Sequence, residues 1–259
     1  MFNTISTLVT TIRDRRPLII NFTNDVTMDF VANGLLSLGA SPIMTQASQE
    51  IDDLCAIAQA VVINIGTLND EFIALCKKVA SVANRLGIPI TLDPVGVGAS
   101  QYRTKTCLDL LERFKFSIIR GNASEIMALS GLKHGSKGVD SLAATEQAIE
   151  SAQNLVSRYK EVVIAVSGQT DVVIEAGRVQ QFERGSPLMP MVTGSGCLLS
   201  SVVSAFDAVH DNSYDAVSAA VVFYGVCGEI AASKSAGPGS FRMHFLDALS
   251  SLPESHHYE

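Results

Sequence analysis

Charged residues, and basic ones in particular, are scarce in this chain of 259 residues. Charged residues make up 17% of it and hydrophobic ones 47%, a composition that builds a large core in one domain or at most two. Only 19 lysines and arginines stand against 26 aspartates and glutamates, which gives a net charge of −7. Nucleic acids and anionic membranes both require a basic face, so this balance argues against either as the main partner. An acidic protein can still hold a phosphorylated ligand through one local positive site.

Paired cysteines are also missing. The five cysteines are isolated, odd in number and without a C-x-x-C pair: Cys55, Cys76, Cys107, Cys197 and Cys227. This spacing argues against a zinc site or a disulfide framework and favours reduced thiols, so we expect a cytoplasmic protein.

The sequence shows neither a targeting pattern nor a membrane-spanning one. The N-terminus lacks the charged-then-apolar order of a signal peptide. The most apolar late segment is interrupted by Asp215 and Glu229, and the stretch between them is shorter than the ~20 residues that a membrane span requires. We therefore expect a buried helix in this segment.

Two common phosphate-binding patterns are absent, yet a glycine turn remains. The pattern G-x-x-x-x-G-K-[ST] does not occur, and Leu199 occupies the third glycine position of G-x-G-x-x-G. Residues 192–197 read Val-Thr-Gly-Ser-Gly-Cys, and small and apolar residues follow through Phe206. A glycine turn that opens a buried helix directs unpaired N–H groups and the positive end of the helix dipole at a ligand. The segment therefore predicts an anion site, with a helix start that holds no ligand as the alternative.

Short apolar runs alternate with segments of helical period. Five runs, nearly continuous in Val, Ile and Leu, indicate strands covered on both faces: 18–22, 60–65, 88–92, 116–119 and 162–166. Apolar residues at helical spacing lie between them, at 31–38, 72–86 and 149–159. Residues 171–183 predict a β-hairpin, and the chain from Gly194 onward is nearly all helix. The alternation indicates an α/β fold, with a mostly parallel central sheet and helices on both faces.

Polar residues follow the predicted strands at one edge of the sheet, where α/β proteins bind ligands. Asp93 follows one strand, Arg120 and Glu125 follow the next, and Ser167 follows a third. Phosphoryl transfer requires oxygen ligands for magnesium, which Asp93 and Glu125 supply, and a cation on the phosphate, which Arg120 supplies. Two structural alternatives stay open: Asp93 as a turn or helix-cap residue, and Arg120 with Glu125 as an ion pair.

Seven segments, in order along most of the chain, resemble the motif series of hydroxyethylthiazole kinase: 21–33, 39–44, 64–68, 92–99, 119–126, 137–141 and 192–197. The resemblance implies a ribokinase-like three-layer fold, with residues 1–259 forming a single kinase domain. It implies ATP-dependent phosphorylation of the hydroxyl of 4-methyl-5-(2-hydroxyethyl)thiazole in thiamine salvage, with Mg²⁺ as cofactor and ATP as co-substrate. It also implies a homotrimer whose active site lies near subunit interfaces.

The same resemblance implies roles for individual residues. They fall into four groups: thiazole contacts by Asn24, Met44 and Gly194; ATP contacts by Arg120, Ser167 and Gly196; magnesium binding by Asp93 and Glu125; and catalysis by Cys197 and Arg120. The segment 137–141 receives no clear role, and a glycine-rich surface loop is an equally good interpretation of it.

Cys197 stands where sugar kinases of the same superfold carry an aspartate base for the alcohol. A free thiol has a pKa of ~8.5, and we expect the helix N-terminus to lower it. Cys197 would then either take the proton of the alcohol or only position the alcohol. Structural alternatives remain for three of these residues: Cys197 as a small buried hydrophobe, Met44 as a core residue and Asn24 as a turn residue.

Three other functions compete with this interpretation. A different reaction on the same superfold would be the phosphorylation of another small alcohol or an ATP-dependent dehydration. A nicotinamide or flavin oxidoreductase is disfavoured by the incomplete dinucleotide pattern. A non-catalytic binding module is disfavoured by the acidic pair and Arg120 on one edge of the sheet.

Overall fold

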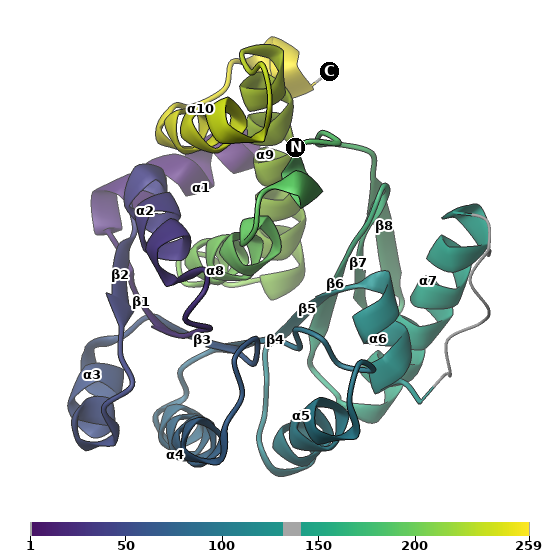
Figure 1. Ribbon diagram of the computed structural model, residues 1–259. Helices are drawn as coiled ribbons and strands as arrows, with labels where there is room; N and C mark the ends of the chain where they lie inside the picture. Colours follow the sequence, from purple (N-terminus) through teal and green to yellow (C-terminus); the bar gives the residue numbers. More distant parts are fainter. Residues whose placement is uncertain (1, 132–140, 259) are drawn as a thin grey trace.

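An eight-stranded sheet forms the middle layer of the computed structural model, which describes residues 2–131 and 141–258 (Figure 1). Its order is β2-β1-β3-β4-β5-β6-β7-β8. The strands are β1 (Leu18–Phe22), β2 (Ser41–Met44), β3 (Ala60–Asn64), β4 (Ile90–Asp93), β5 (Ile118–Asn122), β6 (Val163–Ser167), β7 (Asp171–Glu175) and β8 (Arg178–Phe182). Neighbours from β2 through β6 run parallel, and β7 and β8 add an antiparallel hairpin at one edge. The predicted α/β architecture and the hairpin are confirmed.

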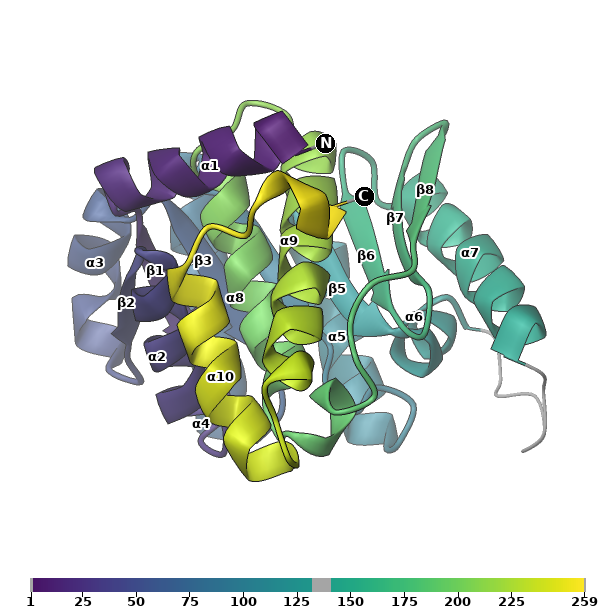
Figure 2. The same cartoon turned by 90° about the horizontal axis from the view of Figure 1, so that it is seen from above.

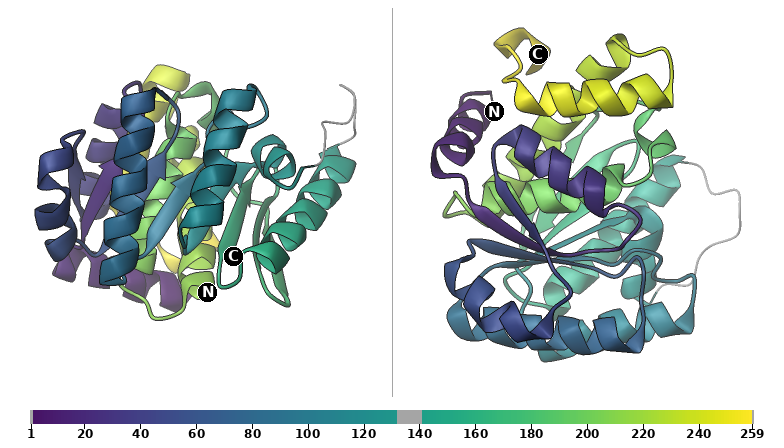
Figure 3. Two further views of the ribbon diagram at one scale, coloured as in Figure 1. Left: turned by 90° about the horizontal axis from the view of Figure 1, so that it is seen from below. Right: turned by 60° about the vertical axis from the view of Figure 1, so that its left-hand side comes forward.

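Helices cover both faces of the sheet (Figures 1 and 3). One layer contains α3 (Ile51–Ile57), α4 (Asp70–Leu86), α5 (Gln101–Arg113), α6 (Ala123–Leu129) and α7 (Ser141–Arg158). The other contains α1 (Phe2–Arg15), α2 (Met28–Leu38), α8 (Ser195–Asp207), α9 (Ser213–Ser233) and α10 (Pro238–Ser250). Figure 2 looks onto this second layer, where α8 and α9 lie between the sheet and the outer helices.

Alternate residues of each strand belong to different halves of the core. Ile19 and Val62 belong to the half that includes α8 and α9, whereas Ile20 and Val61 belong to the half that includes α4 and α5. Because helices cover both faces, both sets of side chains must be apolar, and the strands appear in the sequence as continuous apolar runs.

Two strands continue further than the sequence predicted. β4 ends at Asp93 rather than at residue 92, and β5 ends at Asn122 rather than at residue 119. The apolar runs set the predicted ends, but the backbone ladder continues through polar residues, since Asp93 pairs with Asn64 and Arg120 pairs with Ala165. Asp93 and Arg120 are therefore strand residues and do not follow the strands. The ends of β3, β6 and β8 differ from prediction by one residue.

The edge strand β2 was not predicted at all. It has four half-buried residues and contains Pro42, so it carries neither a long apolar run nor an alternating pattern. Proline is tolerated there because, among the described strands, β2 pairs only with β1 and lies at the edge of the sheet.

Helix α9 is the buried helix that the apolar late segment predicted. Of the helices that the structure describes, it alone is long and apolar enough to cross a membrane, and 78% of that apolar window is buried inside the protein. It contacts both α8 and α10, which is typical of a core helix. Of the segment 137–141, only Ser141, where α7 begins, lies within the described residues, so no role for it can be tested.

Candidate active site

The carboxyl ends of the parallel strands meet the start of α8. Ser200 of α8 donates a hydrogen bond of 2.7 Å from Oγ to Oδ2 of Asp93 on β4. Asn24, just after β1, donates from Nδ2 to Sγ of Cys197 at 3.3 Å. The predicted glycine turn and the predicted acidic residue therefore lie at the same edge of the sheet.

Gly194 opens α8 in a conformation that only glycine adopts easily, with a φ of +93°. A Cβ atom there would also lie 2.9 Å from Cγ2 of Thr27. No side chain of the described residues caps this helix. The N–H of Ser195 donates to the carbonyl of Val192, so the N–H groups of Gly196 and Cys197, together with the positive end of the helix dipole, suit an anion.

Arg120 on β5 is only 8% exposed and lies against the start of α8. Its Nε and Nη2 atoms donate to Oγ of Ser167 at 3.0 and 2.6 Å. A Cβ atom at Gly196 would lie 2.7 Å from its Nη1 atom, so glycine allows the guanidinium to approach the helix. Among the described residues no ion pair joins Arg120 to Glu125, which excludes the structural ion-pair alternative.

The side chain of Asp93 is fully buried, and only one of its two carboxylate oxygen atoms accepts hydrogen bonds from the described residues. Its Oδ2 atom accepts hydrogen bonds of 2.7 Å from Asn64 Nδ2 and from Ser200 Oγ. Its Oδ1 atom is buried without a hydrogen-bond partner among the described residues. Burial raises the pKa of Asp93 to about 6, opposed by the Arg120 guanidinium and reinforced by the Glu125 carboxylate. Its side chain caps none of the described helices, so the helix-cap interpretation is wrong, whereas its carbonyl does accept from the N–H of Val95 at 2.9 Å in the turn that follows β4.

The Glu125 carboxylate connects the turn after β4 to the start of α6 at the same edge of the sheet. It forms a capping box with Asn122, whose N–H donates to Oε2 at 2.9 Å, while the N–H of Gly96 donates to Oε1 at 2.9 Å. The described residues contain no group of three or more His, Cys, Asp or Glu that could hold a metal ion. Both oxygen atoms of the Glu125 carboxylate therefore accept backbone N–H groups, whereas Oδ1 of Asp93 has no hydrogen-bond partner among the described residues.

The expectation that the helix N-terminus lowers the pKa of Cys197 is wrong. Burial raises this pKa, and the nearby charge of Asp93 raises it further, because both disfavour a thiolate. Hydrogen bonds with Asn64, Thr27 and Asn24 act in the opposite direction without overcoming burial. Cys197 is therefore a neutral, half-buried thiol at neutral pH.

Of the residues predicted to contact the thiazole, Asn24 contacts Cys197 directly and Gly194 precedes it at the start of α8. Met44 is half-buried at the end of β2, pairs with Asn21 on β1 and packs against the core half that contains α8. Asn24 is only 4% exposed, and its Oδ1 atom accepts from N and Oγ1 of Thr27 at 3.1 and 3.0 Å. Its amide is thus bonded within the protein.

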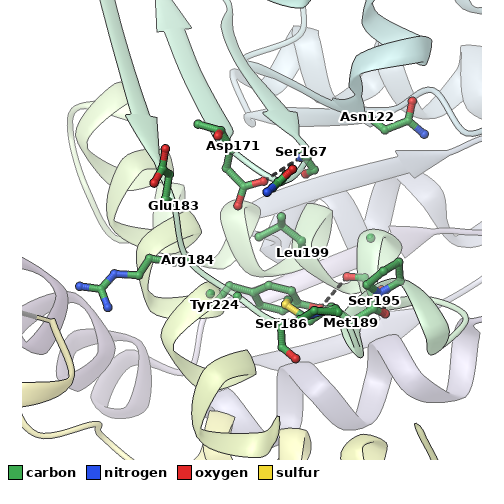
Figure 4. A pocket seen from close by; sticks show the side chains of 18 of the residues that line it. Asn122, Ser167, Asp171, Glu183, Arg184, Ser186, Met189, Ser195, Leu199 and Tyr224 are labelled. Carbon is green, nitrogen blue, oxygen red and sulfur yellow. Dashed lines mark hydrogen bonds between the residues drawn. The ribbon is translucent and has the colours of Figure 1, made fainter. Parts of the chain in front are cut away.

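A cavity of about 780 Å³ opens between β5, β6, α8 and α9 (Figure 4). Arg120, Ser167 and Gly196, the three residues predicted to contact ATP, all line it. Figure 4 shows Ser167 and Asp171 on one wall and Tyr224 with Met189 on another. The other predicted residues lie outside this lining: Asn24, Met44, Asp93, Glu125, Gly194 and Cys197.

Sequence reasoning missed several lining residues, of which Asp171 is the most informative. Its Oδ1 atom accepts from the N–H of Gly168 at 3.0 Å. Burial raises its pKa to about 6, although the Gly168 hydrogen bond and the Arg120 charge both lower it. In the sequence, Asp171 looks like an ordinary residue at the start of the hairpin strand β7. The Ser-Gly-x-x turn before it is the only local signal that a ligand could bind at this edge of the sheet.

The 183–191 segment forms a wall of the cavity and rests directly on α9. A Cβ atom at Gly225 would lie 2.5 Å from Cβ of Arg184, and one at Gly228 would lie 2.6 Å from Sδ of Met189. The N–H of Gly185 donates to Oε1 of Glu229 at 3.0 Å, which adds a polar anchor. Two glycines and a carboxylate of α9 therefore fix this segment.

Comparison with known proteins agrees with this geometry. Residues 9–255 match the family model described as "Hydroxyethylthiazole kinase family". A hydroxyethylthiazole kinase of Carboxydothermus hydrogenoformans is 44% identical over 259 residues, which is 100% of this chain and 96% of that protein. One of Desulfotalea psychrophila is 42% identical over 238 residues, 92% of this chain and 87% of that protein.

Solved structures give the same result for the fold. The hydroxyethylthiazole kinase protein of Pyrococcus horikoshii superposes with a TM-score of 0.87 and 37% identity, covering 96% of this chain and 93% of that one. A ribokinase-like superfamily protein of Enterococcus faecalis has a TM-score of 0.66 at 13% identity, covering 91% and 88%. At that identity the likeness concerns the fold alone, and it confirms the predicted ribokinase-like architecture.

Proposed function

The chain belongs to the hydroxyethylthiazole kinase family, and on that premise we propose that it transfers the γ-phosphate of ATP to the hydroxyl of 4-methyl-5-(2-hydroxyethyl)thiazole. The family carries out this phosphorylation in thiamine salvage. The observation that carries the proposal for this chain is the buried Arg120 guanidinium, which lies against Gly196 at the uncapped start of α8, inside a cavity of about 780 Å³.

ATP occupies the cavity, with its phosphates toward the start of α8. Arg120, Ser167 and Gly196 contact the phosphates, since a guanidinium, a hydroxyl and a backbone N–H are all suited to phosphate oxygens. The thiazole alcohol lies on the other side of α8's first turn, near Met44, Asn24 and Gly194. The lining supports this division, because it includes the first three residues and none of the second three.

The transfer forms a bond between the alcohol oxygen and the γ-phosphorus and breaks the bond to the oxygen that bridges the β- and γ-phosphorus atoms. Arg120 and the N–H groups of α8 stabilise the charge on the oxygen atoms of the transferring group. Because the transition state is loose, the alcohol proton leaves late, passes to an oxygen atom of the transferred phosphate and then to water, and requires no strong base. Cys197 positions the alcohol through Sγ, since its raised pKa keeps the thiol neutral.

Asp93 and Glu125 would hold Mg²⁺, partly through water. The buried Oδ1 atom of Asp93, which has no partner among the described residues, supports this assignment. When bound, the ion neutralises negative charge on the ATP phosphates.

We further infer a single kinase domain, a homotrimer with its active sites near the subunit interfaces, and a cytoplasmic location. The last inference agrees with five free cysteines. Light scattering of the purified protein tests the trimer, and a monomeric mass would exclude it.

An assay of ATP consumption with hydroxyethylthiazole, with and without Mg²⁺, tests the function. We expect Mg²⁺-dependent ADP release together with a phosphorylated thiazole in the mass spectrum. Sugars and other small alcohols serve as controls for a different acceptor. ATP consumption that leaves the thiazole unmodified while a control alcohol gains phosphate would contradict the proposed substrate.

A further inference from the structure

Two buried asparagines connect the carboxylate of Asp93 to the thiol of Cys197. Asn64 at the end of β3 donates from Nδ2 to Oδ2 of Asp93 at 2.7 Å. Asn24 donates from Nδ2 to Oδ1 of Asn64 at 3.0 Å and to Sγ of Cys197 at 3.3 Å. Asn64 and Asn24 are 1% and 4% exposed, so water does not compete for these contacts.

Backbone N–H groups fix the orientation of both amides. The N–H of Gly66 can only donate, and it lies 3.0 Å from the Oδ1 atom of Asn64. The N–H of Thr27 likewise donates to the Oδ1 atom of Asn24 at 3.1 Å. Turning either amide over would place an NH₂ group against an N–H group, so neither asparagine has a second orientation of similar energy.

The fixed orientations leave Asn24 with no free polar group. Its Oδ1 atom accepts twice from Thr27, and its Nδ2 atom donates once to Asn64 and once to Cys197. An amide has two acceptor sites and two N–H groups, so all four are in use. Asn24 is therefore suited to holding Cys197 in place and has no polar group left to hydrogen-bond to a substrate.

Close packing at Gly66 holds the two amides together. A Cβ atom at Gly66 would lie 2.7 Å from Cβ and 2.9 Å from Nδ2 of Asn24. Only glycine therefore lets Asn24 come within reach of both Asn64 and Cys197.

We propose that Asn64 and Asn24 are positioning residues, which form an amide relay from Asp93 that holds Sγ of Cys197 in place for phosphoryl transfer. The proposal rests on the function proposed above. Sγ accepts the N–H of Asn24, so the S–H hydrogen points away from that amide, and Asn64 and Thr27 also hydrogen-bond to the thiol. The relay thereby determines which side of the sulfur atom faces the alcohol, and it joins the predicted magnesium ligand to the predicted alcohol site.

A double-mutant cycle with Asn64→Ala and Cys197→Ala tests the role of the relay in catalysis. We expect Asn64→Ala to lower kcat about tenfold or more in the parent, because misplacement of a positioned group slows the reaction strongly, with KM for ATP within about twofold. In the Cys197→Ala background the same change should lower kcat less than about twofold, since the atom being positioned is gone.

Asn21→Ala is the matched control. Asn21 is a fully buried asparagine on β1 that also bonds to α8, accepting from Oγ of Ser201 at 2.7 Å, without contact to Cys197. It should affect stability as Asn64→Ala does and leave kcat near the parent value. An equal loss of kcat for Asn64→Ala in both backgrounds would overturn the proposal. It would show that Asn64 acts by holding Asp93 or by stabilising the fold, and not through Cys197.

Infrared difference spectra give a readout that does not depend on activity. Subtracting the spectrum of Cys197→Ala isolates the S–H stretching band of Cys197. Asn64→Ala should shift this band and Asn21→Ala should not; an unshifted band in Asn64→Ala would refute the relay. If the parent protein does not phosphorylate the thiazole, the proposed function fails, and the infrared comparison still decides whether the relay exists.

Discussion

Replacing Gly196 by alanine should separate activity from stability in this protein. Gly196 is the second residue of α8, where alanine has a better helix propensity than glycine by up to about 1 kcal/mol. The added Cβ atom would nevertheless lie 2.7 Å from Nη1, 3.2 Å from Nη2 and 3.4 Å from Cζ of Arg120. Since ordinary contacts begin near 3.4 Å, the guanidinium has to move by several tenths of an ångström.

The group that moves is the Arg120 guanidinium, which is proposed to hold phosphate. The end of a long side chain shifts at little cost to the fold, so the unfolding temperature of Gly196→Ala should stay at or above that of the parent. The hydrogen bonds to Ser167, at 2.6 and 3.0 Å, cannot both survive the shift. A misplacement of about 1 Å costs on the order of 100-fold in rate, so we expect kcat to fall about 10- to 100-fold.

Steady-state kinetics of ATP turnover and thermal unfolding, measured on the same preparations, test this prediction. Gly239→Ala is the control, because Gly239 is likewise the second residue of its helix, α10, and no atom lies within 4 Å of an added Cβ. A second control places Gly196→Ala in an Arg120→Ala background, where it should have no further effect. Parent-level kcat and KM in Gly196→Ala would refute the argument that this close approach matters.

Three further predictions concern single residues. Arg120→Ala should lower kcat about 100- to 1,000-fold while the protein stays folded, and activity equal to the parent in the ATP assay would remove Arg120 from the mechanism. Cys197→Asp should remain active, because a carboxylate suits a site that positions an alcohol; a folded variant that binds substrate and has no turnover would contradict this. The pKa of Asp171 is raised from 3.8 to about 6, so the folded state binds its proton more tightly than the unfolded state, and this contribution to stability is lost as the pH rises from about 4 through 6. Asp171→Asn should therefore reduce the pH dependence of the free energy of unfolding between pH 4 and pH 7 by up to about 3 kcal/mol, and an unchanged pH dependence would show that the pKa of Asp171 is not raised.

The layers of the fold could be predicted from the sequence because burial on both faces of the sheet leaves long apolar runs. The ends of the strands could not, because β4 continues to the buried Asp93 and β5 continues through the buried Arg120 to the exposed Asn122. Asp93 illustrates this: its place in β4 depends on hydrogen bonds from Asn64 and Ser200, which are remote in the sequence. The edge strand β2 left no signal since four half-buried residues with a proline carry no periodicity.

Site residues could be predicted from the sequence where they stand in a recognisable local motif. The glycine turn at Gly194 correctly predicted the start of α8, and the polar residues after the apolar runs correctly predicted that Asp93 and Arg120 lie near the ends of their strands, whereas the anion site stays a prediction. The predicted direction of the pKa shift of Cys197 is wrong, because its position at a helix start can be recognised in the sequence whereas its burial beside Asp93 cannot. Asp171 and the 183–191 segment were missed for a similar reason, since their place beside the cavity depends on how the hairpin and α9 pack.

The contact of the 183–191 segment with Gly225 and Gly228 has a consequence for ligand affinity. A wall that α9 already holds in place need not be ordered when a nucleotide arrives, so the entropy lost on binding falls on the nucleotide and a few side chains. The same contact limits how the pocket can evolve. A side chain at Gly225 would press on Cβ and the backbone of Arg184 and displace the wall, whereas one at Gly228 would meet only the flexible side chain of Met189. The shape of the pocket can therefore change through the residues that face it more readily than through Gly225 on the helix behind it.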